Sequence, residues 1–209
     1  MFFSIGSDCH PAMVLKNLNL RQKSSPFDWI DTKGISVFEY FYENITTDFK
    51  YFLYDLEKNE KSQPYSKKYP NSIFLHDLDI IENNNVKEKY IKRIERLQLN
   101  YNNSKCVFVC NITSNSILSN DIVSKLYVDC LKIINDDIFI TNRHSLYIYI
   151  RYDEDFTENE EYCNSFYTKI KNLTNNNVLI NKYCRKFKED GIWGDASKYS
   201  IFFEDLLVL

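Results

Sequence analysis

Apolar segments of strand length alternate with amphipathic segments along most of the chain. A short, nearly continuous apolar run is typical of a buried strand, and six segments contain one: residues 2–6, 72–77, 105–112, 137–141, 145–150 and 177–187. Apolar residues recur at helical spacing in other segments: residues 11–18, 35–42, 86–99, 121–134, 166–173 and part of 193–207. The polar segment 58–71, which includes two prolines, is predicted to be a surface loop, and the acidic segment 153–161 is predicted to be solvated.

This alternation predicts an α/β fold, a single domain over residues 1–209 with a mostly parallel sheet flanked by helices. Of the 209 residues, 44% are hydrophobic and 26% charged, as expected of a globular domain with a sizeable core. In parallel sheets, ligands bind at the carboxyl ends of the strands. Reactive side chains at these ends are therefore the first candidates for a functional site.

Cys9 follows the first predicted strand. The turn after residues 2–6 runs through Ser7 and Asp8, and Pro11 suits the first turn of the next helix because that position needs no backbone N–H. Cys9 is thus predicted near a helix N-terminus, where the dipole favours a thiolate and free N–H groups could hold an oxyanion. The competing interpretation is a small buried residue, because free cysteine is among the most buried residue types.

A thiol nucleophile needs a base, and the chain has three histidines. His76 is the best placed because it ends a predicted strand and precedes Asp77. Its competing interpretation is a helix cap or surface residue. The side chain of His10 is expected to point away from the adjacent Cys9, and His144 falls in a predicted turn.

Three aspartates could orient such an imidazole: Asp28, Asp77 and Asp195. Each could equally be a helix cap or a turn residue, because aspartate readily binds nearby backbone groups. The aromatic segments around Trp29 and Trp193 are expected in the core, with a ligand-binding wall as the alternative. Arg93 and Arg96 lie on an amphipathic helix and are predicted to form a solvated basic face.

Charge and motif content narrow the classes of partner. The formal net charge of -3 and a pI near 5.7 argue against nucleic acid or an anionic membrane as the main partner. No Gly-rich phosphate-binding motif is present, so no cofactor is expected. The six cysteines lack CxxC spacing and the three histidines are far apart, so no metal site is predicted. Without a long apolar segment or a secretory leader, the protein is predicted to be cytoplasmic.

Residues 4–29 resemble the opening of the DUF1796 family, described as papain-like cysteine peptidases. The shared pattern is a strand, a Gly-x-x-Cys turn, a helix and Pro-Phe-Asp-Trp. Looser likeness occurs in four segments: residues 74–77, 92–97, 107–109 and 193–195. The resemblance implies that Cys9 is the nucleophile and His76 its partner, with Asp28 or Asp195 as further site residues. It also implies an alternative fold, a papain-like α+β arrangement in which a long helix carries the nucleophile and a β-rich half supplies the histidine.

The chain departs from the family where relatives often carry an arginine after the central strand, because Cys110 and Asn111 stand there. The resemblance also bears on the source. The family occurs in bacteria and in large DNA viruses, and a composition rich in Asn, Lys, Tyr and Phe is expected of an AT-rich viral genome. A viral protein of this kind would act in the host cytoplasm.

The residues and the resemblance together favour a cysteine-dependent hydrolase, peptidase or acyl transferase. Cys9 would attack a carbonyl carbon and His76 would pass the proton to the leaving group. The amides of the first helix, beside Ser7 and Asp8, would hold the oxyanion. The substrate would be a peptide, an acyl compound or a glycan.

Two other functions fit the same sequence. The first is a non-catalytic module that binds a protein or a glycan through aromatic loops at Trp29 or Trp193. The second is an SGNH-like esterase, in which Ser7 rather than Cys9 is the nucleophile.

Overall fold

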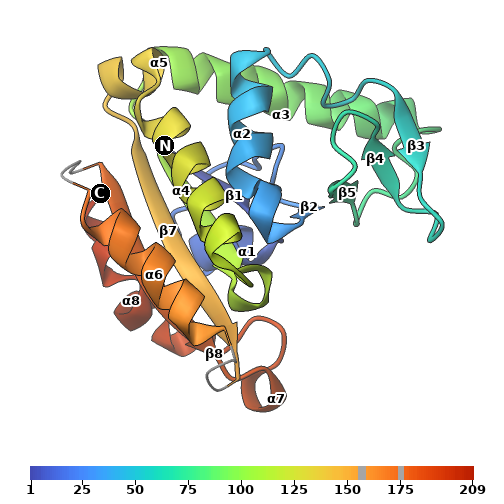
Figure 1. Ribbon diagram of the computed structural model, residues 1–209. Coiled ribbons are helices and arrows are strands. Elements are labelled where there is room, and N and C mark those ends of the chain that lie inside the picture. The colour runs from blue at the N-terminus through green and yellow to red at the C-terminus, as the bar shows by residue number, and fades with distance from the viewer. Residues whose placement is uncertain (155–158, 174–176) are drawn as a thin grey trace.

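The computed structural model describes residues 1–154, 159–173 and 177–209, and the strands of these residues form two sheets (Figure 1). The larger sheet has four parallel strands in the order β1 (Phe2–Gly6), β6 (Val107–Thr113), β7 (Ser145–Asp153) and β8 (Val178–Arg185). Strands β6 and β7 are almost entirely buried, because both faces of the sheet are covered. The predicted α/β fold with a parallel sheet flanked by helices is confirmed.

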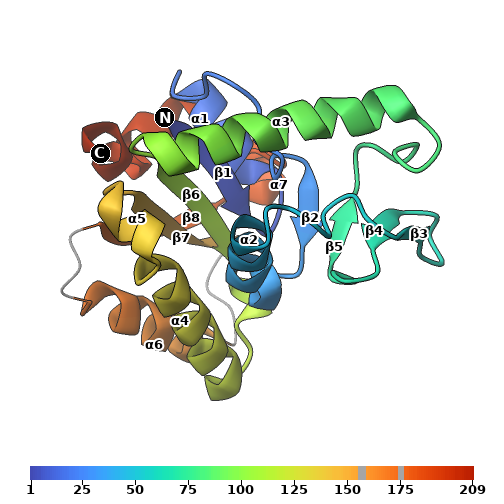
Figure 2. The same cartoon turned by 90° about the horizontal axis from the view of Figure 1, so that it is seen from above.

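One face of the parallel sheet packs against most of the helices. These are α2 (Val37–Thr46), α3 (Asn84–Asn103), α4 (Asn120–Ile134), α5 (Asp137–Thr141) and α6 (Glu160–Lys171). Their apolar side chains form one core with sheet residues such as Phe3, Phe108 and Ile148. Figure 2 shows α4 and α6 side by side below the sheet.

The opposite face is covered by α1 (His10–Asn17) and by two C-terminal segments, α8 (Tyr199–Phe202) and η4 (Glu204–Val208). Leu15 of α1 and Phe203 pack there with Tyr149 of β7. Because side chains alternate along a strand, Arg151 of β7 faces the same side as Tyr149. Shorter helical turns lie at Gly34–Ser36 (η1), Ser114–Ser116 (η2), Phe187–Asp190 (α7) and Ala196–Lys198 (η3).

The smaller sheet is antiparallel, with the order β2 (Ile30–Thr32), β5 (Ser72–Phe74), β4 (Pro64–Ser66) and β3 (Leu56–Lys58). The two sheets meet where the Thr32 N–H donates to the Ser7 carbonyl, 2.9 Å away. The prediction that residues 58–71 form a surface loop is wrong, because strand β4 lies within this segment. The strand has only three residues, and the polar composition of the segment gave no sign of it. The predicted strand 72–77 exists as β5, but it belongs to this sheet and not to the parallel one.

Two further predictions are wrong. Residues 137–141, predicted as a strand, form the helix α5. Arg93, predicted to be solvated, is only 9% exposed and lies over the Tyr90 ring of the same helix, α3.

The predicted solvated segment 153–161 falls partly on residues 155–158, which lie outside the described residues. Within the segment, Asn159 is buried, and its amide donates to the carbonyls of Ser114 and Ile117. Across the described ranges, no helix combines the length and the apolar character needed to cross a bilayer.

Candidate functional site

The turn that carries Cys9 is fixed by Asn111 of the neighbouring strand β6. The Ser7 N–H donates to both the backbone carbonyl and Oδ1 of Asn111, at 3.0 and 2.9 Å. The Ser7 hydroxyl donates to the same carbonyl at 3.1 Å, and Asn111 Nδ2 donates to Asp8 Oδ1 at 2.9 Å. Asn111 therefore holds the turn at the carboxyl edge of the parallel sheet.

A network of charged side chains continues along this edge from Asp8. Arg151 at the end of β7 donates to Asp8 at 2.6 Å and to Asp153 at 3.1 Å, and Arg185 of β8 lies 2.7 Å from Asp153. Burial opposes the ionisation of Asp8, but the Arg151 guanidinium and the His10 N–H outweigh it and lower the pKa of the Asp8 carboxyl. Asp8 is therefore an anion beside the Cys9 thiol at neutral pH.

Cys9 is half-buried and stands immediately before α1, as predicted. Burial, followed by the charge of Asp8, raises the pKa of the Cys9 thiol to about 11. The N-terminus of α1 does little to lower the pKa of the Cys9 thiol. Pro11 has no N–H, the His10 N–H already donates to Asp8, and the Cys9 N–H is the backbone donor that favours the thiolate. The resting thiol is therefore protonated at neutral pH.

Asp31, which sequence reasoning did not single out, is the second carboxylate whose charge acts on Cys9. Burial, followed by the charge of Asp8, raises the pKa of Asp31. No hydrogen bond or salt bridge joins its carboxylate to any described residue, whereas Asp8 is fully engaged. Asp31 begins the polar stretch of residues 31–33, two residues after Trp29, and nothing in the local sequence distinguishes it.

His10 is buried behind the turn, and both of its ring nitrogens are engaged. Nδ1 lies 2.8 Å from the Tyr149 hydroxyl and Nε2 lies 3.2 Å from the Trp193 carbonyl, which can only accept. Nε2 therefore carries the proton, and Nδ1 accepts from Tyr149. Burial, followed by the charge of Arg151, lowers the pKa of His10 to about 4, so the ring is neutral and structural.

His144, the third histidine, is fully buried away from this edge. Its Nδ1 accepts from the Cys106 N–H at 3.0 Å, and its Nε2 donates to the Tyr101 carbonyl at 2.9 Å. Burial lowers the pKa of His144 to about 4, so this ring too is a neutral brace between backbone segments.

His76 lies beside Trp29, and the structure places no contact between it and Cys9. The ring centroids of His76 and Trp29 are 5.2 Å apart, and His76 is exposed. Asp77 does not orient this imidazole, because its carboxylate accepts from Lys89 Nζ at 2.5 Å and from the Tyr90 hydroxyl at 2.7 Å.

Asp28 is buried close to Trp29 and binds three donors: the Ser4 hydroxyl, the Arg21 guanidinium and the Ser25 N–H. Burial outweighs these contacts and raises the pKa of Asp28. Arg21 also lies over the Trp29 ring, with Cζ 5.7 Å from the centroid.

Asp195 and Trp193 belong to the C-terminal segment. Asp195 caps η3 by accepting from the Ser197 N–H at 3.0 Å and pairs with Lys198 at 2.9 Å, so it contacts no histidine. Trp193 contributes its carbonyl to His10 and to the Tyr199 hydroxyl.

The predicted site residues thus do not form one site. Ser7, Asp8, Cys9 and the Trp193 carbonyl gather at the carboxyl edge of the parallel sheet. A second group, Trp29 and His76, lies beside the smaller sheet, whereas Asp28 binds Ser4 of β1 and Asp195 belongs to η3. Sequence reasoning missed Arg151, for which a signal existed: it is the charged residue that follows the buried apolar run of β7, at an end where ligands gather.

No three His, Cys, Asp or Glu side chains converge as metal ligands would in the part of the chain that the structure describes. Comparison with known proteins gives one match, to a family model described as "Putative papain-like cysteine peptidase (DUF1796)", over residues 1–132. Neither the curated proteins nor the solved structures contain a match.

Proposed function

Because the chain belongs to the DUF1796 family, we propose that it is a cysteine-dependent hydrolase or acyl transferase whose nucleophile is Cys9. The observation that carries the proposal is the position of this thiol. Cys9 is half-exposed at the carboxyl edge of a parallel sheet, before a helix, and within the matched segment. Four other cysteines are buried, and the exposed Cys184 lies outside the matched segment.

The raised pKa of Cys9 sets a condition on the mechanism. A thiol with a pKa of about 11 is protonated at rest, so the proton must leave as the sulfur–carbon bond forms. Asp31 is the candidate to accept that proton, because its charge acts on the thiol whereas Asp8 is held by Arg151 and Asn111. This role requires the Asp31 carboxylate, or one water bound to it, to come within hydrogen-bond distance of the Cys9 sulfur. Asp31 would then return the proton to the leaving group, and water or another acceptor would release the acyl group from sulfur.

His76 remains the alternative base. It follows β5 of the smaller sheet, and that sheet touches the Cys9 turn through the bond from Thr32 to Ser7. A role for His76 in catalysis requires its side chain to leave Trp29 and approach the thiol. The esterase alternative finds less support, because the Ser7 hydroxyl is buried and donates to the Asn111 carbonyl.

One observation favours a second candidate function, a non-catalytic binding module. The carboxylates beside Cys9 oppose the thiolate, and no histidine contacts the thiol. These are the properties of an unreactive cysteine, and such a chain would retain the family's fold without its chemistry.

An ester probe that leaves an acyl group on a reactive thiol separates the two functions. With p-nitrophenyl acetate, intact-mass measurement is expected to show one acetyl adduct, which Cys9→Ala abolishes and Cys184→Ala retains. An adduct that persists in Cys9→Ala, or none in the wild type, overturns the hydrolase and leaves the binding module.

The Asp31→Asn variant identifies the base because its two effects have opposite signs. Removing a negative charge beside the thiol lowers the pKa of Cys9, so alkylation by iodoacetamide at pH 8 is expected to become faster. Removing the base is expected to slow acylation by the ester at least about 10-fold. If Asp31→Asn speeds both reactions while His76→Ala slows acylation, the base is His76.

A further inference from the structure

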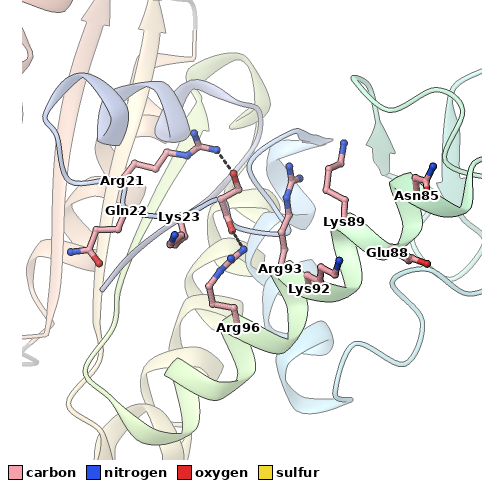
Figure 3. Close-up of a pocket in the computed structure, with 10 residues that line it drawn as sticks. Arg21, Gln22, Lys23, Asn85, Glu88, Lys89, Lys92, Arg93 and Arg96 are labelled. Atoms are coloured by element: carbon pink, nitrogen blue, oxygen red, sulfur yellow. Dashed lines mark hydrogen bonds between the residues drawn. The ribbon is translucent and has the colours of Figure 1, made fainter.

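A basic pocket lies between the segment after α1 and the outward side of α3, on a part of the molecule that the proposed function does not use (Figure 3). Its volume is about 690 Å³, within the usual range for small-molecule sites. Six of its lining side chains are basic: Arg21, Lys23, Lys89, Lys92, Arg93 and Arg96. Glu88 is the one acidic residue among those that line it.

The protein neutralises only part of the positive charge of this pocket. Arg21 pairs with Asp28, and Lys89 pairs with Asp77. The remaining four basic residues form no salt bridge within the described residues: Lys23, Lys92, Arg93 and Arg96. A local surplus of this size stands out in a chain whose formal net charge is -3.

Arginine donors in the pocket are buried without acceptors. Arg93 is nine-tenths buried, and its Nη1 has no hydrogen-bond partner. The Nε atoms of Arg21 and Arg96 are also buried and unpartnered. A buried charged donor without an acceptor costs free energy, and an anion bound in the pocket would recover it.

The arginines are also held in place. Arg93 lies over the Tyr90 ring, 5.0 Å from its centroid. Arg21 donates to the Ser24 hydroxyl at 3.0 Å, and Arg96 donates to the Ser24 carbonyl at 3.1 Å. The dashed lines in Figure 3 mark these two bonds. Guanidinium groups fixed in this way present paired donors that match the oxygens of a phosphate group.

We propose that this pocket binds a small phosphorylated ligand, with Arg93 and Arg96 contacting phosphate oxygens and the exposed Lys23 and Lys92 adding charge. A small ligand is favoured over a nucleic acid because the basic side chains converge on one pocket of a protein whose formal net charge is -3. The pocket borders the second group of predicted residues, since Arg21 contacts Trp29.

Titration calorimetry with inorganic pyrophosphate at 0.15 M NaCl tests the proposal. The wild type is expected to bind one pyrophosphate per chain. The double variant Lys23→Gln/Lys92→Gln, which changes only exposed side chains, is expected to raise Kd at least about 10-fold. Lys61→Gln removes one positive charge from an exposed residue outside the pocket and is expected to leave Kd unchanged.

Arg93→Gln is expected to weaken binding more than the double variant, with thermal unfolding of the free protein recorded to show that it folds. Absence of saturable binding by the wild type, or equal loss in Lys61→Gln and the double variant, overturns the proposal. Tighter binding of a 12-nucleotide single-stranded RNA, weakened by the same double variant, would replace the small ligand with a nucleic acid. Cys9→Ala is expected to bind pyrophosphate normally, so this result is independent of the proposed hydrolase.

Discussion

Gly6 lets β1 pass directly beside Asn111 before the chain turns toward Cys9. Its φ is +146°, a conformation that residues with a side chain rarely adopt. A Cβ at this position would lie 2.2 Å from Asn111 Oδ1 and 2.8 Å from the Asn111 nitrogen. The same Oδ1 accepts from the Ser7 N–H, so a side chain at position 6 would displace the group that holds the turn.

Gly6→Ala is therefore expected to lower the free energy of unfolding by about 2 to 4 kcal/mol, measured by urea denaturation at pH 7. Gly191→Ala is the matched control, because Gly191 also has a positive φ but no atom lies within 4 Å of where its Cβ would be. Its expected loss is about 1 kcal/mol. Equal losses in the two variants would mean that the close approach to Asn111 is irrelevant to stability.

At the level of the element, α5 is a helix whose composition favours a strand. Residues 138–141 are Ile, Phe, Ile and Thr, all common in strands. Asp136 favours the helix instead, because it caps the N-terminus: its Oδ1 accepts from the N–H groups of Ile138 and Phe139, both at 3.1 Å. The Tyr101 hydroxyl donates to the same oxygen at 2.9 Å and ties the cap to α3. A cap and one tertiary contact outweigh the β propensity of the segment.

Asp136→Ala is expected to lower the free energy of unfolding by about 2 kcal/mol, because it removes the cap and leaves the Tyr101 hydroxyl unpaired. The adjacent exposed Asp137 gives a control with the same change of charge. Asp137→Ala is expected to cost no more than about 0.5 kcal/mol, since it makes only a favourable interaction with the helix dipole. Urea denaturation of both variants measures the difference, and a smaller loss in Asp136→Ala would contradict the capping argument.

At the level of the whole molecule, residues 133–209 complete a sheet that the family match covers only in part. The match ends within α4, yet β7 and β8 form half of the parallel sheet. β7 pairs with β6 along its whole length and β8 pairs with β7, while the C-terminal Phe203 and Leu206 cover the face next to α1. Without them, β6 would lose its partner on one side and the apolar faces of β1 and β6 would be exposed.

A fragment of residues 1–132 is therefore expected not to fold by itself, because it leaves two parallel strands with uncovered faces. Near-ultraviolet circular dichroism and urea titration are expected to show neither fixed aromatic packing nor a cooperative transition. The full chain with Phe203→Ala serves as the comparison and is expected to unfold cooperatively, about 3 kcal/mol less stable than the wild type. A cooperative transition in the fragment would show that the matched segment is an independent unit.

Local patterns in the sequence were sufficient for the strongest elements. Strands β1, β6 and β7 follow from continuous apolar runs, and α3 and α4 from clear helical spacing of apolar residues. The smaller sheet was not predictable in the same way, because each of its strands has three residues and their pairing is long-range. The burial of Arg93 could not be predicted from the sequence either, since it depends on the Tyr90 ring and on the pocket beside α3.

The sequence by itself determined that Cys9 stands between a parallel strand and a helix, because Gly6 and Pro11 act on the backbone within a few residues of it. Only the tertiary structure decided what surrounds the thiol. Arg151, 143 residues from Asp8, reaches that carboxylate because β6 places β7 two strands from β1. His76 lies two residues beyond the end of β5, not within a strand as predicted, and β5 pairs in the other sheet. The physical reason is that backbone periodicity is set by neighbouring residues, whereas a reactive group's partners depend on strand order and register across the whole chain.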